Sequence, residues 1–164
     1  MRKRLAAFVF CLVLACSVNA FSAPKTQLPG DLTLAQAQKV LQAALVKATA
    51  QGVPMNIAIV DAGGNLKAFA RQDGAFLGSI DIATKKAKTA RYFNMPTSAL
   101  TAAAQPGQEL YGIEVSNNGL VVFSGGELLV NADNVIIGAI GVSGGTVAED
   151  TNVAKAGVAG LLAK

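Results

Sequence analysis

The sequence predicts one α+β domain in which helices flank an antiparallel sheet of about five strands. Short apolar runs occur as neighbours joined by glycine-containing turns, which is typical of β-hairpins. Three other segments place apolar residues at helical spacing. The predicted order is helix, two strands, helix, three strands and helix, so neighbouring strands are joined by hairpins and not by helical crossovers. About 140 residues beyond the N-terminal leader are enough for one hydrophobic core.

The N-terminal leader has the pattern of a secretory signal at residues 1–20. Residues 1–4 contain three basic side chains, and the stretch from Leu5 to Ala20 carries no charge. This stretch is short for a transmembrane helix, and no other segment offers roughly 20 consecutive apolar residues. We expect cleavage after Ala20 in preference to Ala23. The mature protein is then periplasmic or secreted and has no transmembrane helix.

The leader leaves a second processing route open. Residues 13–16, VLAC, have the form of a bacterial lipoprotein box, in which a lipid on Cys16 would anchor the protein. The two cysteines, Cys11 and Cys16, both lie in the leader, so cleavage after Ala20 leaves no disulfide. The leader also holds three of the 14 basic residues, and the remaining 11 nearly balance the 10 acidic ones. This balance gives no electrostatic basis for binding nucleic acid.

A tether at residues 21–31, which contains prolines and a glycine, leads into the domain that we place at 32–164. The first helix of the domain begins with a capping box formed by Thr33 and Gln36. It ends at Gly52, which is typical of a helix C-terminus.

Two strands and a second helix follow. Residues 55–71 contain two strand-like runs around the turn DAGGN at 61–65. Ser79 is the expected N-cap of a helix that reaches about Asn94, and the alanines of this helix form a small-residue stripe suited to close packing. Pro96 ends the helix.

The C-terminal third predicts three further strands and a helix. Apolar runs lie on both sides of the turn at residues 124–126, and a third run, VIIGAIGV, occupies residues 135–142. Gly138 and Gly141 inside this third run indicate a bulge or a close approach of another backbone. The chain closes on a helix that begins at about Ala148.

The residue types that most catalytic and metal sites need are missing from the mature chain. It has no histidine and, once cleaved, no cysteine, which excludes Ser-His-Asp and Cys-His nucleophiles. The usual zinc, copper and non-haem iron ligands are absent for the same reason. The carboxylates do not have the spacing of a calcium or magnesium loop. We therefore expect no metal site and no catalytic residue, and a binding protein is favoured over an enzyme.

The apolar run at 135–142 leads into Gly144 and Gly145, for which several interpretations exist. No βαβ unit frames a dinucleotide motif here, and a Walker loop would need a lysine. Thr146 and Glu149 form a capping box, so the glycines can simply turn a strand into a helix. A glycine-lined helix start also exposes N–H donors to a carboxylate ligand. Glu149 and Asp150 would compete with such an anion, which favours the structural role.

One local basic cluster lies on the second predicted helix. It consists of Lys85, Lys86, Lys88 and Arg91. The cluster is either a solvated helix face, on which Asp81 and Lys85 form an i,i+4 pair, or an anion site that uses one of the lysines.

The order of three motifs resembles that of the GlcG/HbpS-like family, also called haem-binding or haem-degrading domain proteins. The motifs are DGAFLGSIDIATKKAKTARYF at residues 73–93, FSGGELLV at 123–130 and VIIGAIGVSGGTVAED at 135–150. The likeness covers residues 32–164. It implies a profilin-like fold with about five antiparallel strands and assembly into homo-oligomers. It also implies haem binding, which in some secreted members is linked to a membrane sensor kinase.

The resemblance places the family's ligand-site positions in two clusters. The first motif supplies Asp73, Gly74, Ser79, Lys86 and Thr89. The late glycine turn supplies Gly144 and Gly145, followed by the acidic pair Glu149 and Asp150. If the two clusters meet at a subunit boundary, they line a small pocket. Otherwise they are turn and packing positions that define the fold.

The sequence departs from the haem-binding members at the iron ligand. Several of those members use a histidine, which this chain lacks. A haem ligand would then be Met95 or Tyr92, because methionine and tyrosine are known axial ligands. Met55, Tyr111 and the lysines stay open as further donors.

The leading interpretation is an exported, oligomeric, non-catalytic binding protein for haem or a related tetrapyrrole. One alternative is a pocket or enzyme for a small carboxylate such as a 2-hydroxy acid, in which Lys86 and the two glycines provide the positive end. Another is a partner protein of a membrane sensor. An apolar slot near Tyr92 and Met95 would favour haem, whereas a polar pocket around Asp73, Ser79 and Lys86 would favour the carboxylate.

Overall fold

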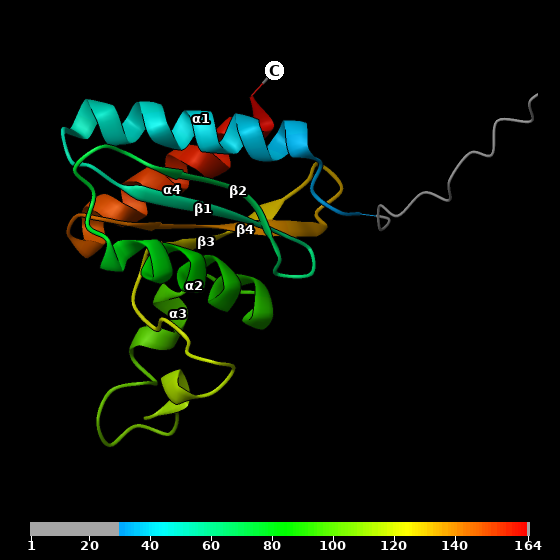
Figure 1. Cartoon of the computed structure of the whole chain (residues 1–164). Coiled ribbons are helices and arrows are strands. Elements are labelled where there is room, and N and C mark those ends of the chain that lie inside the picture. The colour runs from blue at the N-terminus through cyan, green and yellow to red at the C-terminus, as the bar shows by residue number, and fades with distance from the viewer. Residues whose placement is uncertain (1–29, 164) are drawn as a thin grey trace, which may run out of the picture.

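The computed structural model describes residues 30–163, so the predicted signal at 1–20, the processing sites and most of the 21–31 tether lie outside the described residues. The described part has helices on both sides of one sheet (Figure 1). In chain order the elements are α1 (Leu34–Gln51), β1 (Asn56–Asp61), β2 (Leu66–Arg71), α2 (Gly78–Phe93), α3 (Ser98–Thr101), the 3-10 helix η1 (Ile113–Val115), β3 (Gly126–Val130), β4 (Ile136–Ser143) and α4 (Val147–Leu162). Within residues 30–163, no helix is both long and apolar enough to cross a membrane.

The four strands form one antiparallel sheet in the order β2-β1-β4-β3. The two central strands, β1 and β4, are buried along almost their whole length, which explains their nearly continuous apolar sequences. The predicted α+β class, with an antiparallel sheet flanked by helices, is confirmed. The described sheet has four strands in place of about five.

The strand that does not form is the apolar run at residues 119–123, which the sequence predicts as one arm of a hairpin. Its backbone bonds to side chains of two helices instead of to a neighbouring strand. The Val121 N–H donates to Thr89 Oγ1 at 3.0 Å, and the Val122 carbonyl accepts from Thr101 Oγ1 at 2.8 Å. Because these two backbone groups are satisfied in this way, the run is a loop, buried at Leu120 and Val121 and exposed at Phe123. The hairpin predicted around the following glycines is wrong.

Two hydrophobic cores lie on opposite faces of the sheet. Helices α1 and α4 pack side by side over one face, and α2 covers the other face alone (Figure 1). The larger core, beneath α1 and α4, includes Val40, Ile57 and Ile140. The core beneath α2 is built mostly from alanines and valine. The small side chains bring α2 unusually close to the strands.

Two paired glycines make this close packing possible. Gly126 of β3 and Gly141 of β4 lie opposite each other, and both face α2. A Cβ atom at Gly141 would overlap the carbonyl oxygen of Ala83, and a Cβ atom at Gly126 would lie 2.5 Å from the carbonyl oxygen of Lys86. The glycine spacing therefore indicates a close backbone approach, as the sequence predicts for Gly141.

Helix starts follow the predicted chemistry in two of three cases. The capping boxes at Thr33 and Thr146 are both formed, and each threonine accepts the N–H three residues later. The prediction of Ser79 as an N-cap is wrong, because α2 begins one residue earlier, at Gly78, and Leu77 provides no side-chain cap. Ser79 instead lies buried in the first turn.

The last residue of the predicted tether is fixed to the sheet. Asp31 Oδ1 accepts the N–H groups of Leu32 and Ala62 at 2.9 and 3.0 Å, and its Oδ2 lies 3.4 Å from Lys67 Nζ. Burial alone would raise the pKa of Asp31, but the Ala62 and Leu32 hydrogen bonds and the Lys67 partner outweigh burial and lower it. This contact fixes where the chain enters the domain.

Candidate functional site

The most unusual polar feature of the domain is a buried ion pair between α2 and α4. Lys86 Nζ lies 2.7 Å from Asp150 Oδ2 and donates a second hydrogen bond, of 2.9 Å, to the Val142 carbonyl at the end of β4. Lys86 has no exposed surface, and Asp150 is 2% exposed. Charged side chains are almost never buried to this extent without a partner. The pair therefore links both helical layers to the central sheet.

The surroundings of this pair are built from backbone and aromatic groups. Asp150 Oδ1 accepts the Gly145 N–H at 3.1 Å, so the carboxylate lies between an ammonium group and a backbone donor near the start of α4. The ring centroid of Phe123 lies 4.7 Å from Lys86 Nζ, within the range of a cation–π contact. A Cβ atom at Gly125 would lie 2.7 Å from the same nitrogen, so only glycine leaves room for the ammonium.

Burial sets the electrostatics of this cluster. Desolvation lowers the pKa of Lys86, and the hydrogen bond and charge of Asp150 act in the opposite direction without cancelling it. The ammonium is thus held by one strong partner in a medium that disfavours its charge. Loss of that partner would leave an uncompensated buried charge.

The other members of the first predicted cluster lie at different depths. Thr89 is buried and bonds to the loop that replaces the fifth strand. Ser79 is buried, and its hydroxyl accepts a hydrogen bond of 3.1 Å from Ser143. Asp73 is exposed and Gly74, with φ of +83°, forms the turn before α2. The structure thus separates this cluster into an exposed turn before α2 and buried side chains on α2 itself.

The second predicted cluster has its donors already occupied. Gly145 donates to Asp150, and the Thr146 N–H donates to Glu149 Oε2 at 2.8 Å. The hydrogen bonds from the backbone and side chain of Thr146 lower the pKa of Glu149. Gly144 faces the Pro54 carbonyl, where a Cβ atom would overlap. An external anion at this helix start would have to displace a carboxylate of the chain itself.

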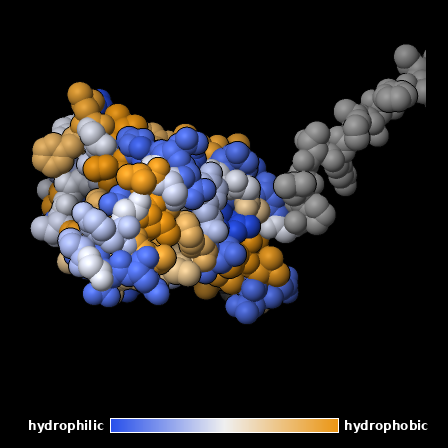
Figure 2. Space-filling view, turned by 90° about the horizontal axis from the view of Figure 1, so that it is seen from below, coloured by the Kyte–Doolittle hydropathy of each residue, from blue (hydrophilic) through white to orange (hydrophobic). Residues whose placement is uncertain are grey.

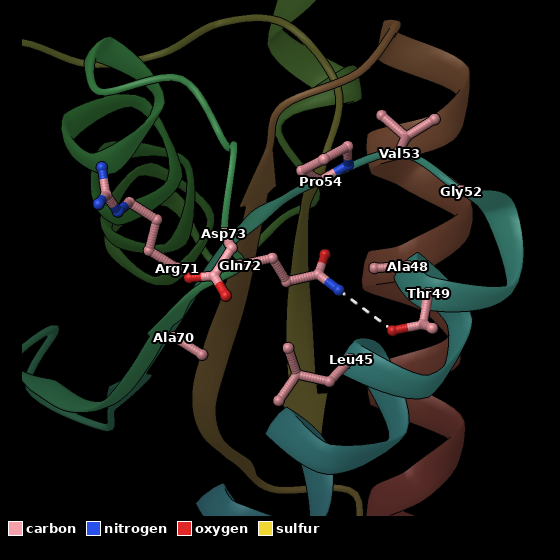
Figure 3. Close-up of a pocket in the computed structure, with 10 residues that line it drawn as sticks. All are labelled: Leu45, Ala48, Thr49, Gly52, Val53, Pro54, Ala70, Arg71, Gln72 and Asp73. Carbon is pink, nitrogen blue, oxygen red and sulfur yellow. Dashed lines mark hydrogen bonds between the residues drawn. The ribbon is translucent and has the colours of Figure 1, made fainter.

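An open groove of about 580 Å³ lies elsewhere, between the C-terminal half of α1 and the end of β2 (Figure 3). Its walls combine apolar and polar residues, namely Leu45, Ala48, Thr49, Gly52, Val53, Pro54, Ala70, Arg71, Gln72 and Asp73. Gln72 reaches across the groove and donates to Thr49 Oγ1 at 3.1 Å, whereas Arg71 points away (Figure 3). Of the sequence-predicted site residues, only Asp73 lines this groove.

The candidate haem ligands are distributed over the domain. Tyr92, near the end of α2, is 47% exposed, and its ring lies against Gly64 in the β1–β2 turn. Met95 follows α2 and is half-buried, Tyr111 is 63% exposed, and Met55 is fully buried in the larger core. None of these four side chains lines the groove. The groove is therefore neither the apolar slot near Tyr92 nor the polar pocket around Lys86.

Two groups in the ion-pair cluster, Phe123 and Gly125, were not predicted as site residues. Asp150 belongs to the acidic pair that the resemblance implies, and the predicted capping box uses Glu149, but nothing in the sequence places Asp150 beside Lys86. Phe123 and Gly125 lie in a segment that the sequence predicts as a strand and turn.

Among residues 30–163, no group of three or more His, Cys, Asp or Glu side chains could hold a metal ion.

Comparison with known proteins identifies relatives along most of the chain. The profile of the family described as haem degrading protein HbpS-like matches residues 32–159. An uncharacterized 15.0 kDa protein from the dhaT-dhaS intergenic region of Citrobacter freundii is 43% identical over 131 residues, which cover 80% of this chain and 92% of that protein. The corrinoid adenosyltransferase PduO of the same organism is 36% identical over 131 residues, which span only 39% of its length.

Solved structures share the fold. The protein ORFY of Klebsiella pneumoniae has a TM-score of 0.80 and 38% identity, covering 87% of this chain and 98% of its own. A PduOC:heme complex has a TM-score of 0.74 and 34% identity, covering 79% and 94% respectively. HbpS has a TM-score of 0.71 and 32% identity, covering 87% and 96%. The resemblance in motif order is thus confirmed, and this chain belongs to the HbpS-like family.

Proposed function

We propose that this protein binds haem or a related tetrapyrrole and has no catalytic activity of its own. The observation that carries the proposal is its likeness to a relative whose structure is a complex with heme, at 34% identity over 79% of this chain. The family description, which refers to haem, supports the same ligand class.

Tyr92 and Met95 are the proposed iron ligands. Tyr92 is the better placed of the two, because nearly half of its surface is exposed while its ring is held against the β1–β2 turn. A phenolate oxygen and a thioether sulfur both have precedents as axial ligands. Met55 is a poorer ligand, because its side chain would have to leave the core.

The groove between α1 and β2 is the other place where a tetrapyrrole could lie. Leu45, Val53 and Pro54 offer an apolar wall, and the volume of about 580 Å³ is within the range of small-molecule sites. Its lining contains no methionine, tyrosine or lysine, so haem bound there would have only oxygen donors such as Asp73. The two locations therefore predict different effects of substitution.

A visible-light haem titration of the mature protein tests the proposal. We expect a saturable Soret band that is lost or shifted in Tyr92→Phe or Met95→Leu. Tyr111→Phe is the matched control, because it removes the same hydroxyl from the segment at residues 98–125, away from Met95 and the β1–β2 turn, and should leave the band unchanged. If the band were lost only in Leu45→Asp, the haem would be assigned to the groove between α1 and β2. Absence of any band up to the solubility limit of haem would contradict the proposal.

Export and self-association are part of the same proposal. The loop before α2 and the segment at residues 98–125 expose large apolar side chains, including Phe76, Leu77 and Val115. On the view from below, apolar residues gather among polar ones on this side of the molecule (Figure 2). Such surfaces mark contacts with other proteins when they are contiguous. Intact-mass analysis of the exported protein distinguishes cleavage after Ala20 from lipidation of Cys16, and native mass spectrometry gives the subunit number.

A small carboxylate is the second candidate ligand; in the native protein it would have to displace the Asp150 carboxylate, which occupies this position. Lys86 and Gly145 hold its carboxylate at 2.7 and 3.1 Å, so this cluster already recognises that group. In an Asp150→Ala variant, acetate or glycolate should restore part of the lost thermal stability, whereas equal chloride should not. Equal effects of all three salts would contradict specific recognition.

A further inference from the structure

The Phe123 ring lies against the buried Lys86 ammonium and is itself partly exposed to solvent. Its ring centroid lies 4.7 Å from Lys86 Nζ, and the residue is 40% exposed. The two oxygen atoms bonded to the ammonium come from Val142 and from Asp150, which are both buried. One aromatic side chain therefore contacts the amine on one side and solvent on the other.

The backbone on both sides of Phe123 is held by hydrogen bonds, whereas its ring offers no polar group for such a bond. The Val122 carbonyl accepts from Thr101, and the Gly125 carbonyl accepts the Val142 N–H at 2.9 Å. The phenyl ring has no polar group to anchor it, so rotation about its side-chain bonds can expose Nζ without moving the sheet.

We propose that Lys86 is a gated reactive amine that condenses with small, uncharged aldehydes, with Asp150 as its proton acceptor and Phe123 as the gate. Desolvated lysines lose their proton readily and are the usual Schiff-base residues of proteins. Burial already lowers the pKa of Lys86, and a carboxylate lies 2.7 Å from its nitrogen. The negative charges of Asp150 and of nearby Glu149 select against anionic carbonyl compounds.

The reaction conserves charge at the buried pair. Asp150 takes one proton from the ammonium, and the free electron pair of Nζ forms a bond to the carbonyl carbon. The carbonyl oxygen then leaves as water with two of the three original ammonium protons, one of them returned through Asp150. The third proton stays on nitrogen as a protonated imine, so the product keeps the positive charge that pairs with Asp150. Nothing is oxidised or reduced in this step.

Labelling of the full-length mature protein with acetaldehyde and cyanoborohydride tests the assignment, because the hydride traps the imine as a secondary amine. Lys85 is the internal control: it is the neighbour of Lys86 in sequence, its side chain is 32% exposed, and it pairs with Asp81 on the helix surface. Peptide mass mapping should show labelling of Lys86 at least several-fold faster than of Lys85, despite its burial. Phe123→Ala should accelerate labelling of Lys86 alone, and Phe123→Leu should do so less.

Controls keep the result interpretable. Lys86→Arg retains the positive charge and should remove the fast-labelling site, and circular dichroism establishes that each variant is folded. Glyoxylate, which is an anionic aldehyde, should react more slowly than acetaldehyde at Lys86. The proposal would be overturned if lysines were labelled in order of their solvent exposure. Lys86 would then stay unmodified in the native protein and in a folded Phe123→Ala variant. Faster reaction with glyoxylate would overturn the assigned ligand class.

Discussion

Removal of the Asp150 charge should destabilise the domain far more than removal of the exposed Asp81 charge, which pairs with the neighbouring lysine on α2. Two unit charges 2.7 Å apart attract by roughly 6 kcal/mol at an effective dielectric constant of about 20. Desolvation of both groups offsets much of this attraction, and breaking such a pair costs about 3–5 kcal/mol because one charge remains buried alone. Asp150→Asn keeps an oxygen acceptor for the Gly145 N–H, so the change is mainly electrostatic.

Urea unfolding followed by far-ultraviolet circular dichroism measures this loss. The matched control is Asp81→Asn, which removes the partner of Lys85, where the acid side chain is 67% exposed. That surface pair should contribute only about 0.3–0.5 kcal/mol. The double variant Lys86→Met with Asp150→Leu should recover most of the lost stability, because no charge remains buried. The reasoning is refuted if Asp150→Asn changes the free energy of unfolding no more than Asp81→Asn does.

Three further substitutions test packing and pH dependence. Gly141→Ala should cost about 3 kcal/mol or more, because its methyl group would overlap the Ala83 carbonyl and push α2 from the sheet; an unchanged urea midpoint would contradict this. The pKa of Glu149 is lowered by its bonds to Thr146, so its contribution is present above the usual value of 4.5 and is lost as the pH falls through the lowered value. Glu149→Gln should therefore flatten the acid limb of the stability curve, and an unaltered limb would argue against this role. Burial raises the pKa of Glu127, so its charged form opposes folding at neutral pH; Glu127→Gln should raise the thermal midpoint near pH 7 and lose this advantage in acid.

Local chemistry accounts for the parts of the fold that the sequence predicts well. Each capping box needs only a threonine and an acid or amide three residues later, and both boxes form at Thr33 and Thr146. The fifth predicted strand does not form, because the hydrogen-bond partners of its backbone come from residues distant in sequence. Thr89 supplies the partner for the Val121 N–H, and these residues lie 32 positions apart. An apolar run indicates that part of a segment is buried, but it does not show whether a strand or a side chain will satisfy its backbone.

The same limit applies to the candidate site. The resemblance to the family directs attention to Lys86, yet its burial and its partner follow from where α4 starts relative to α2. The spacing from Thr146 assigns Glu149 to the helix cap, but only the tertiary structure shows that the adjacent Asp150 is the partner of Lys86. The groove is equally non-local, because Leu45 of α1 and Gln72, which follows β2, are far apart in the chain and carry no joint sequence signal.

The contact of α2 with glycine backbone at Gly126 and Gly141 also determines which movements the domain allows. A helix that packs on side chains can shift as those side chains change rotamer. Helix α2 packs on glycine backbone, which has no side-chain rotamers to change. Helix α2 and the strands beneath it should therefore move as a single rigid body. The amide protons of both should exchange with solvent only in the same rare global opening. Conformational responses to a ligand are left to the segment at residues 98–125. It meets this body through individual hydrogen bonds, in which the Val121 N–H donates to Thr89 Oγ1 and the Gly125 carbonyl accepts the Val142 N–H.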